Sequence, residues 1–145
     1  MLSRTGEYAL RAMIFLVRNA GEQPIAGPRI AAAADVPRKY LSSILADLVR
    51  CGLLEGTRGK SGGFQLTRSA KQIRLAQVVA PFEPVTAGRK KTCPFGNAVC
   101  NDRNPCVAHD RWSEINAALA RFLDETTLED VAKARSDRGK NTRDR

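Results

Sequence analysis

The sequence predicts a mostly α-helical fold with one small β-hairpin, namely a winged helix-turn-helix domain followed by a long dimerisation helix. Three observations support this prediction. Two short helical patterns are joined by the turn Asp35-Val36-Pro37, a glycine-rich turn then separates two extended runs, and a narrow apolar seam recurs late in the chain. Two helices joined by a turn and followed by a hairpin are the parts of a winged helix-turn-helix, whose second helix enters the major groove of DNA.

The first helix is expected over residues 7–19, EYALRAMIFLVRN, with Gly21 as its stop. Its apolar residues are too dense for a single stripe, which is typical of a helix that is buried on most sides. A short second helix is expected over residues 28–34, where four consecutive alanines permit a neighbouring helix to approach closely. In the turn that follows, Asp35 can act as a cap, and Pro37 suits the first turn of the next helix.

The third helix, over residues 37–51, is predicted to read DNA. Its apolar residues recur at helical spacing and form one continuous face: Tyr40, Leu41, Ile44, Leu45, Leu48 and Val49. Basic and hydroxyl side chains, which donate to phosphates and base edges, gather on the opposite face near the helix start: Arg38, Lys39, Ser42 and Ser43. We expect these four residues and Tyr40 to contact DNA. Cys51, at the helix end, is expected to be a small core residue.

The turn Gly59-Lys60-Ser61-Gly62-Gly63 separates two short alternating runs, at residues 53–55 and 64–67, and predicts a β-hairpin. In a winged helix-turn-helix this hairpin is the wing, which touches the DNA backbone or the minor groove. The candidates for that contact are Arg58, Lys60 and Ser61. The turn is not a nucleotide-binding loop, because it lacks the GxxxxGK[ST] pattern and joins a strand to a strand.

Residues 73–82 are expected to form a short amphipathic helix that Pro81 truncates or kinks. A long helix follows from about residue 105, with a narrow apolar seam formed by Trp112, Ile115, Leu119, Phe122 and Leu123. Such a seam after a compact domain suits pairing with the same helix of a second subunit, and the alternative is that it packs back on its own domain. A capping box at residues 126–129 is expected to begin a last short helix.

The chain therefore divides into four segments. We expect residues 1–82 to form the DNA-binding domain, 83–109 a cysteine-rich loop, 110–134 the dimerisation helix with the short terminal helix, and 135–145 a disordered basic tail. The 145 residues carry a formal net charge of +9 and have a pI near 10.0. Such a charge favours a polyanionic partner, and double-stranded DNA is the partner expected.

Several function classes are disfavoured. No apolar run approaches the roughly 20 residues that span a bilayer, and Glu7 and Arg11 interrupt the apolar run that a signal peptide needs. We therefore expect a cytoplasmic protein with reduced cysteines and no membrane partner. The single histidine is the only imidazole that could activate a cysteine, and nothing else resembles a hydrolase, so we expect neither an enzyme nor a small-molecule substrate.

Residues 93–109, CPFGNAVCNDRNPCVAH, hold three of the four cysteines and the only histidine. Six residues separate Cys93 from Cys100 and five separate Cys100 from Cys106, whereas structural zinc sites usually pair their ligands at C-x₂₋₄-C. Thiolates at wide spacing suit an iron–sulfur cluster, which is larger than a single ion. Zinc on three cysteines and His109 is the alternative, and the odd number of thiols disfavours a disulfide.

Several motifs, in this order, resemble one family. They are GEYALRAM at the start, Tyr40-Leu41 in the reading helix, RGKSGGFQL in the wing at residues 58–66, the three-cysteine loop, and FLDETTLEDV at residues 122–131. Together they resemble the Rrf2 superfamily of bacterial transcription regulators, of which the IscR and NsrR types are iron–sulfur members. The resemblance implies a homodimeric winged-helix repressor or activator whose cluster state sets its affinity for an operator.

The resemblance leaves the fourth cluster ligand open. By similarity to the IscR type, His109 would complete a 2Fe–2S cluster; by similarity to the NsrR type, an acidic residue near the start of the first helix of the partner subunit would complete a 4Fe–4S cluster, and Glu7 occupies that position. The six-residue first gap departs from the five usual in the IscR type. The signal would be nitric oxide, iron or cluster supply, or redox state.

Two other function classes stay open at this point. One is a winged-helix regulator that carries no cluster and works through its thiols or a zinc ion, and the other is an interaction module that does not bind DNA.

Overall fold

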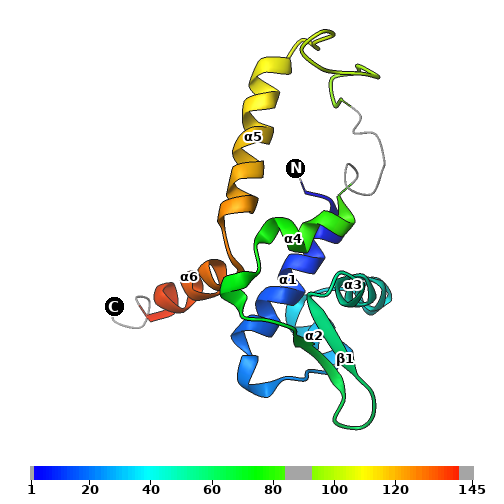
Figure 1. Cartoon of the computed structure of the whole chain (residues 1–145), viewed down its shortest axis with the longest axis vertical. Coiled ribbons are helices and arrows are strands. Elements are labelled where there is room, and N and C mark those ends of the chain that lie inside the picture. Colours follow the sequence, from blue (N-terminus) through cyan, green and yellow to red (C-terminus); the bar gives the residue numbers. More distant parts are fainter. Residues whose placement is uncertain (1, 84–92, 141–145) are drawn as a thin grey trace.

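The computed structural model describes residues 2–83 and 93–140, with side chains through residue 134 (Figure 1). Its longer elements follow in the order α1 (Arg4–Arg18), α2 (Gly27–Ala34), α3 (Arg38–Arg50), β1 (Leu54–Thr57), β2 (Gly63–Leu66), α4 (Leu75–Val79), α5 (His109–Glu125) and α6 (Leu128–Lys140). Three short 3₁₀ turns lie between them: η1 (Ala20–Glu22), η2 (Ala70–Gln72) and η3 (Ala80–Phe82). This arrangement confirms the predicted fold class, because two helices joined by a turn precede a two-stranded antiparallel hairpin.

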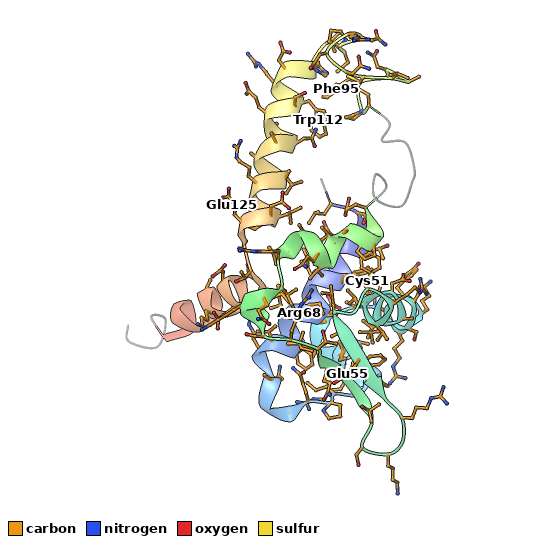
Figure 2. The ribbon with its side chains drawn as sticks, viewed as in Figure 1. Cys51, Glu55, Arg68, Phe95, Trp112 and Glu125 are labelled. Carbon is orange, nitrogen blue, oxygen red and sulfur yellow. The ribbon has the colours of Figure 1, made fainter. Side chains whose placement is uncertain are left out.

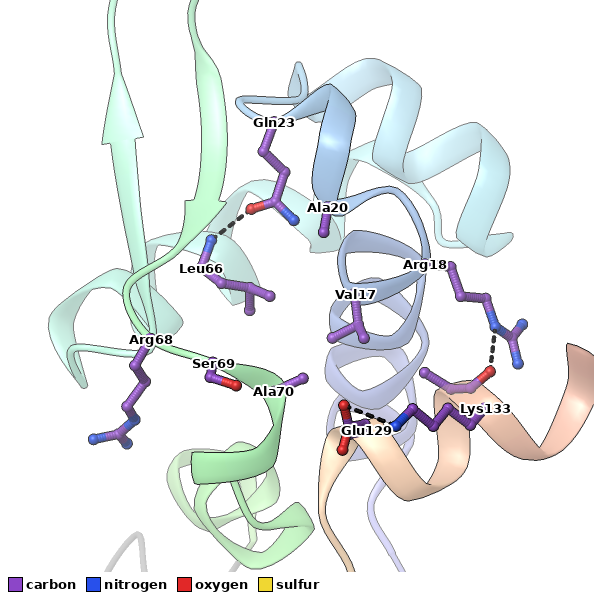
Figure 3. Close-up of a pocket in the computed structure, with 11 residues that line it drawn as sticks. Val17, Arg18, Ala20, Gln23, Leu66, Arg68, Ser69, Ala70, Glu129 and Lys133 are labelled. Atoms are coloured by element: carbon purple, nitrogen blue, oxygen red, sulfur yellow. Dashed lines mark hydrogen bonds and ion pairs between the residues drawn. The ribbon is translucent and has the colours of Figure 1, made fainter.

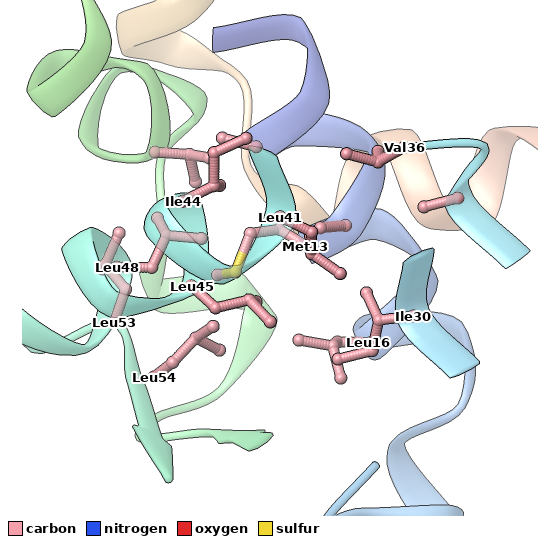
Figure 4. Packing of buried hydrophobic residues seen from close by; sticks show 14 of the residues in the cluster. Met13, Leu16, Ile30, Val36, Leu41, Ile44, Leu45, Leu48, Leu53 and Leu54 are labelled. Atoms are coloured by element: carbon pink, nitrogen blue, oxygen red, sulfur yellow. The ribbon is translucent and has the colours of Figure 1, made fainter. Parts of the chain in front are cut away.

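α1 is the centre of the domain, where it contacts α2, α3, α4 and α6. That position explains the density of its apolar residues. Figure 4 shows the core between α1, α2, α3 and β1, where the buried side chains include Met13, Leu16, Ile30, Leu41, Ile44, Leu45, Leu48, Leu53 and Leu54. Among the described residues no polar or charged residue is buried, so apolar burial holds this core together.

The ends of α1 differ from the sequence prediction. Ser3 caps the helix because its Oγ accepts from the Gly6 N–H (3.0 Å), and α1 therefore starts at Arg4 rather than at residue 7. At the other end Asn19, not Gly21, is the cap. The Asn19 N–H donates to the Leu16 carbonyl, and its side-chain Nδ2 donates to the Phe15 carbonyl at 2.8 Å.

A left-handed residue makes the turn between α2 and α3. Asp35 has φ +54° and closes α2, with its N–H donating to the Ala31 carbonyl. Val36 is buried and fixes the turn against the core. Pro37 is the cap of α3, one position before the helix, and its carbonyl accepts from the Tyr40 and Leu41 N–H groups.

The wing is anchored to the segment before α2. Leu54 lies opposite Leu66 and Thr57 opposite Gly63 in the hairpin, and Ile25 pairs with Phe64 through two backbone hydrogen bonds of 3.0 and 2.8 Å. This close approach explains one glycine, because a Cβ on Gly63 would lie 2.3 Å from the Ile25 carbonyl. Gly63 is therefore required by the close packing of β2 on Ile25.

The helix expected over residues 73–82 is shorter in the structure. α4 ends at Val79, and η3, which contains Pro81, continues as a tighter turn. Ile73 and Arg74 are extended and hold the junction of α5 and α6: the Leu128 N–H donates to the Ile73 carbonyl at 2.9 Å, and Arg74 Nη1 donates to the Glu125 carbonyl at 2.8 Å. This junction is where the C-terminal helices attach to the domain.

The predicted capping box is shifted by one residue. Thr126 ends α5, and Thr127 forms the box with Asp130, whose Oδ2 accepts from the Thr127 N–H (2.9 Å) and hydroxyl (2.8 Å). The Thr127 N–H and hydroxyl bonds hold the pKa of Asp130 below its ordinary value. α6 then continues to Lys140, beyond the predicted start of the tail at Arg135, since residues 128–140 contain no proline to stop the helix. Residues 141–145 of that tail lie outside the described residues.

Candidate DNA-reading surface and metal-binding loop

The start of α3 is an exposed, basic surface. Leu41, Ile44, Leu45 and Leu48 hold one face of the helix in the core. The residues predicted to read DNA are consequently directed outward, and all are exposed: Arg38, Lys39, Ser42 and Ser43. In this part of the helix they offer hydroxyl, ammonium and guanidinium donors of the kind that bind phosphates and base edges.

Tyr40 and Val49 were predicted to continue the apolar face, and the structure corrects this. Their side chains are 48% and 37% exposed. Tyr40 stacks on Tyr8 of α1 with ring centroids 6.2 Å apart, and the Lys39 ammonium lies 4.8 Å from the Tyr40 ring centre. The reason is geometric: positions at the edge of a helical stripe meet α1 from the side, where a tyrosine can stack and stay half in water.

This stacking brings the start of α1 to the DNA-reading surface. The Arg11 guanidinium lies 5.8 Å from the Tyr8 ring centre, and a hydrogen bond to Tyr8 raises the pKa of Arg4 above its ordinary value. Sequence reasoning missed these residues as candidates for contact with DNA. The signal was present in the spacing of Arg4, Tyr8 and Arg11, which places three polar groups on one side of an otherwise apolar helix.

The wing residues project at one end of the molecule. Arg58, Lys60 and Ser61 are exposed and lie in the turn between β1 and β2. Figure 1 shows this turn at the opposite end of the long axis from the cysteine loop, which lies beyond the start of α5. The candidate DNA-contacting residues of the wing and the candidate metal ligands are therefore far apart within one chain.

The three loop cysteines converge. The Sγ atoms of Cys93, Cys100 and Cys106 all lie within 4.8 Å of one another, and the three residues are half-buried free thiols. No other group of three potential metal ligands occurs among the described residues. Three soft thiolate donors at this separation fit an iron–sulfur cluster, and with a fourth ligand they also fit zinc.

Asparagines hold the loop in this shape. Asn101 and Asn104 pair through their backbones, the Asn104 Nδ2 group donates to the Val99 carbonyl at 2.7 Å, and the Asn97 Nδ2 group donates to the Asn104 carbonyl at 3.1 Å. These bonds replace the helix or strand pairing that the segment lacks. Consequently Cys100 and Cys106 are brought together by a tight turn at residues 101–104.

The thiols differ in acidity. Desolvation acts to raise the pKa of Cys93, but the Phe95 and Asn97 N–H groups and the two neighbouring thiols outweigh it and lower that pKa. At Cys100 the Cys106 N–H acts to lower the pKa, and desolvation together with Cys106 and Cys93 raises it overall. The crowded thiols therefore favour a cation, which allows all three to ionise together.

His109 lies against the cysteine group. Its Nδ1 atom is 3.2 Å from Cys100 Sγ, and its Nε2 atom is 3.0 Å from Asp102 Oδ1. His109 is also the first residue of α5, so the start of this helix places the ring beside the cysteine loop. The ring is adjacent to the thiols but is not one of the three ligands that all lie within 4.8 Å of one another.

Glu7 does not approach the thiols within one chain. It is exposed in the first turn of α1, and Figure 1 shows the start of α1 beside α4, away from the cysteine loop. A ligand role for Glu7 therefore requires a second copy of the chain.

Cys51 is exposed, contrary to the prediction that it is a core residue. It is the cap at the end of α3, and Gly52 (φ +76°) then turns the chain so that Leu53 takes the buried position. Figure 2 shows Cys51 beside α3, remote from Phe95 of the cysteine loop.

The apolar seam of α5 divides into two parts. Leu119 and Leu123 pack against the domain core, whereas Ile115 (57%) and Phe122 (51%) are exposed. Trp112 meets Phe95 edge to face with ring centroids 5.8 Å apart (Figure 2). The seam therefore both attaches α5 to its own domain and leaves large apolar side chains uncovered.

A groove of about 510 Å³ lies between α1, β2 and α6 (Figure 3). Polar groups along it are engaged with one another: Arg18 Nε donates to the Ala132 carbonyl at 3.3 Å, and Lys133 pairs with Glu129 at 3.0 Å. These contacts attach α6 to α1. Within the described residues, no helix is long and apolar enough to cross a membrane.

Comparison with known proteins gives consistent results. A family described as an iron-dependent transcriptional regulator, Rrf2, matches residues 2–134. The HTH-type transcriptional regulator IscR of Cereibacter sphaeroides is 27% identical and is aligned over 91% of this chain and 86% of its own.

Two solved structures are similar in fold. IscR of T. potens has a TM-score of 0.70 and 25% identity, covering 92% of this chain and 87% of its own. CymR, described as the global cysteine regulator of B. subtilis, has a TM-score of 0.71 and 28% identity, covering 92% and 97% respectively.

Proposed function

Because the chain belongs to the Rrf2 family of transcriptional regulators, we propose that it binds operator DNA as a homodimer and that an iron–sulfur cluster sets its affinity. Cys93, Cys100 and Cys106 would hold the cluster. The observation that carries this proposal is the convergence of their three Sγ atoms within 4.8 Å of one another. A bound cluster would supply iron that can change oxidation state or be lost, and this is the change that the regulator detects.

The chain's own residues would contact DNA in two places. α3 enters the major groove, with Ser42 and Ser43 toward base edges and Arg38, Lys39 and Tyr40 at the rim. Phosphates are bound by the exposed wing residues Arg58, Lys60 and Ser61. The net charge of +9 supports binding to DNA, because phosphate contacts supply most of the sequence-independent affinity.

The dimer would form through α5. Ile115 and Phe122 are exposed on this helix, and a second copy can cover them. Two reading helices fit DNA only if they lie about 34–36 Å apart. A change in the pairing of the two α5 helices alters that spacing and hence the affinity, typically by 5–150-fold.

A short chain of contacts links the thiols to α5. The Phe95 N–H donates to Cys93 Sγ (3.4 Å), and the Phe95 ring packs on Trp112 of α5. If Cys93 no longer held the cluster, Phe95 and Trp112 would be free to repack. The cluster state would in this way be coupled to the helix proposed to pair the two subunits.

Anaerobic purification tests the proposal. We expect a coloured protein with visible absorbance and with iron and sulfide in equal amounts, whose affinity for operator DNA changes when the cluster is removed. A colourless protein with no iron, whose DNA affinity responds to thiol oxidation or zinc, would contradict the proposed cluster. The proposal that the chain is a DNA-binding regulator would be retained.

One observation favours that second candidate, a thiol-based regulator. The Cys100 thiol lies 3.2 Å from the His109 ring, and the similar CymR structure is described as that of a cysteine regulator. In this case oxidation of the loop thiols, without any metal, would change DNA binding. Elemental analysis of the anaerobic protein separates the two candidates.

His109→Ala is expected to weaken cluster retention at least roughly 10-fold, and Glu7→Ala is expected to leave it unchanged. The reason is proximity, because His109 already contacts Cys100 within the chain while Glu7 lies elsewhere. The rate of iron release to a chelator measures this under anaerobic conditions. Retention in His109→Ala with loss in Glu7→Ala would assign the fourth ligand to the partner's α1 instead.

A further inference from the structure

The cysteine loop contains an acidic side chain that the proposed cluster does not use. Asp102 Oδ1 lies 3.0 Å from His109 Nε2, while the other ring nitrogen, Nδ1, lies 3.2 Å from Cys100 Sγ. The imidazole of His109 therefore lies between the carboxylate of Asp102 and the thiol of Cys100 and contacts both. His109 is largely buried, with a side chain only 14% exposed, so few other groups can reach its ring.

The chemistry of these groups fixes where the ring proton lies. An ionised carboxylate can only accept a hydrogen bond, so the contact with Asp102 requires a proton on Nε2. A neutral imidazole then has its lone pair on Nδ1. That lone pair is directed at the sulfur group and is available to accept from the Cys100 thiol or to bind a metal ion.

Asp102 is held in this position by its turn. Asn101 and Asn104 exchange backbone hydrogen bonds on either side of it, at 3.0 and 3.4 Å. Asn101 Oδ1 also accepts from the N–H groups of Arg103 and Asn104, both at 2.9 Å. The carboxylate is itself exposed, so its placement comes from this backbone and not from packing of the side chain.

We propose that Asp102 is a positioning residue for His109, which orients the ring and presents Nδ1 as the ligand atom for the metal centre. The proposal rests on the proposed function, since it concerns how the fourth ligand is held. A carboxylate on the far nitrogen of a ligating histidine fixes its tautomer and makes the ring a better donor, and loss of such a partner typically costs 10–100-fold in metal affinity.

The test compares four anaerobically prepared, cluster-loaded proteins: the unaltered chain, Asp102→Ala, Asp102→Asn and Asp110→Asn. Iron release to an excess of chelator is followed by the loss of visible absorbance. We expect release about 10-fold faster for Asp102→Ala and a smaller change for Asp102→Asn, whose amide oxygen can still accept from Nε2–H. Asp110→Asn is the matched control, because it removes the same charge beside His109, and we expect it to behave as the unaltered protein.

A second measurement separates positioning from a loss of loop stability. The chain has one histidine, so after labelling with ¹⁵N-histidine any ¹⁵N coupling seen by pulsed electron paramagnetic resonance of the reduced cluster belongs to His109. We expect Asp102→Ala to change this coupling, whereas a general loosening of the loop would speed iron release and leave it unaltered.

The outcomes are distinct. If the unaltered protein binds no cluster, the proposed function and this inference fail together. If it binds a cluster without ¹⁵N coupling, or if Asp102→Ala has the same ¹⁵N coupling as the unaltered protein at any rate of iron release, Asp102 does not position His109, and the proposal of a cluster-dependent regulator is retained.

Discussion

Serine in place of Cys93, Cys100 or Cys106 is expected to reduce iron binding to background, whereas Cys51→Ser is expected to bind as much iron as the unaltered protein. The three loop thiols lie within 4.8 Å of one another, so each is needed to close the site. Serine keeps the size of the side chain but removes the soft thiolate donor. Cys51 is the matched control, because it is the fourth thiol of the chain and is exposed at the end of α3, away from the loop.

The measurement is iron and sulfide per chain, with visible absorbance, after anaerobic reconstitution of the four variants in parallel. Circular dichroism serves as the control for folding, and we expect no change, since none of the described core residues lies in the cysteine loop. Full iron binding in any one of the loop variants would contradict the three-cysteine site. Iron loss in Cys51→Ser would show that the site extends to the DNA-reading domain.

Lys60→Ala is expected to weaken binding to operator and unrelated DNA alike and to lower the salt slope of binding by about one unit. Lys60 is exposed at the tip of the wing, where a phosphate contact carries no sequence information. One contact with a slope of about 0.9 costs roughly 3.5-fold in affinity when salt rises from 50 to 200 mM. Over the same rise in salt, the fold-loss of DNA affinity should therefore be about 3.5 times smaller for Lys60→Ala than for the unaltered protein.

Fluorescence anisotropy with labelled duplexes at several salt concentrations measures this slope. Lys71→Ala removes an equal charge in η2, outside both α3 and the wing, and we expect it to retain the native slope. Ser43→Ala is a control for sequence-specific contact. Loss of a base-edge contact should weaken binding to operator DNA and leave binding to unrelated DNA unchanged. Equal salt slopes for Lys60→Ala and the unaltered protein would rule out the wing as a phosphate-binding element.

Residue spacing alone predicted most of the fold. The periodicity of α3 and the glycine turn before Phe64 are local signals, and both lead to the elements observed. The shift of the capping box is also local: two adjacent threonines can each cap α6, and the structure uses Thr127, which bonds to Asp130. Likewise the edge positions Tyr40 and Val49 are apolar by pattern, yet their burial depends on what lies beside the helix.

The sequence predicted which side chains could donate to a metal centre at the candidate site, but it did not predict how they are arranged. Cysteines at wide spacing in a loop indicate soft ligands for a cluster, but nothing in the spacing says that His109 faces Cys100 with one nitrogen and Asp102 with the other. That arrangement depends on the turn at residues 101–104. The contact of Tyr8 with Tyr40 is equally hidden, because it joins residues 32 positions apart.

α5 is a long helix that is fixed to the domain at its C-terminal end. Its 17 residues span roughly 25 Å at 1.5 Å per residue, and it is pinned at one end by the bonds of Ile73 and Arg74 to the α5–α6 junction. A displacement of about 2 Å at the free end, where the cysteine loop lies, turns such an arm by only about 5° at the pivot. In the proposed mechanism, a change in the cysteine loop would reach the domain that carries α3 and the wing as a small rotation.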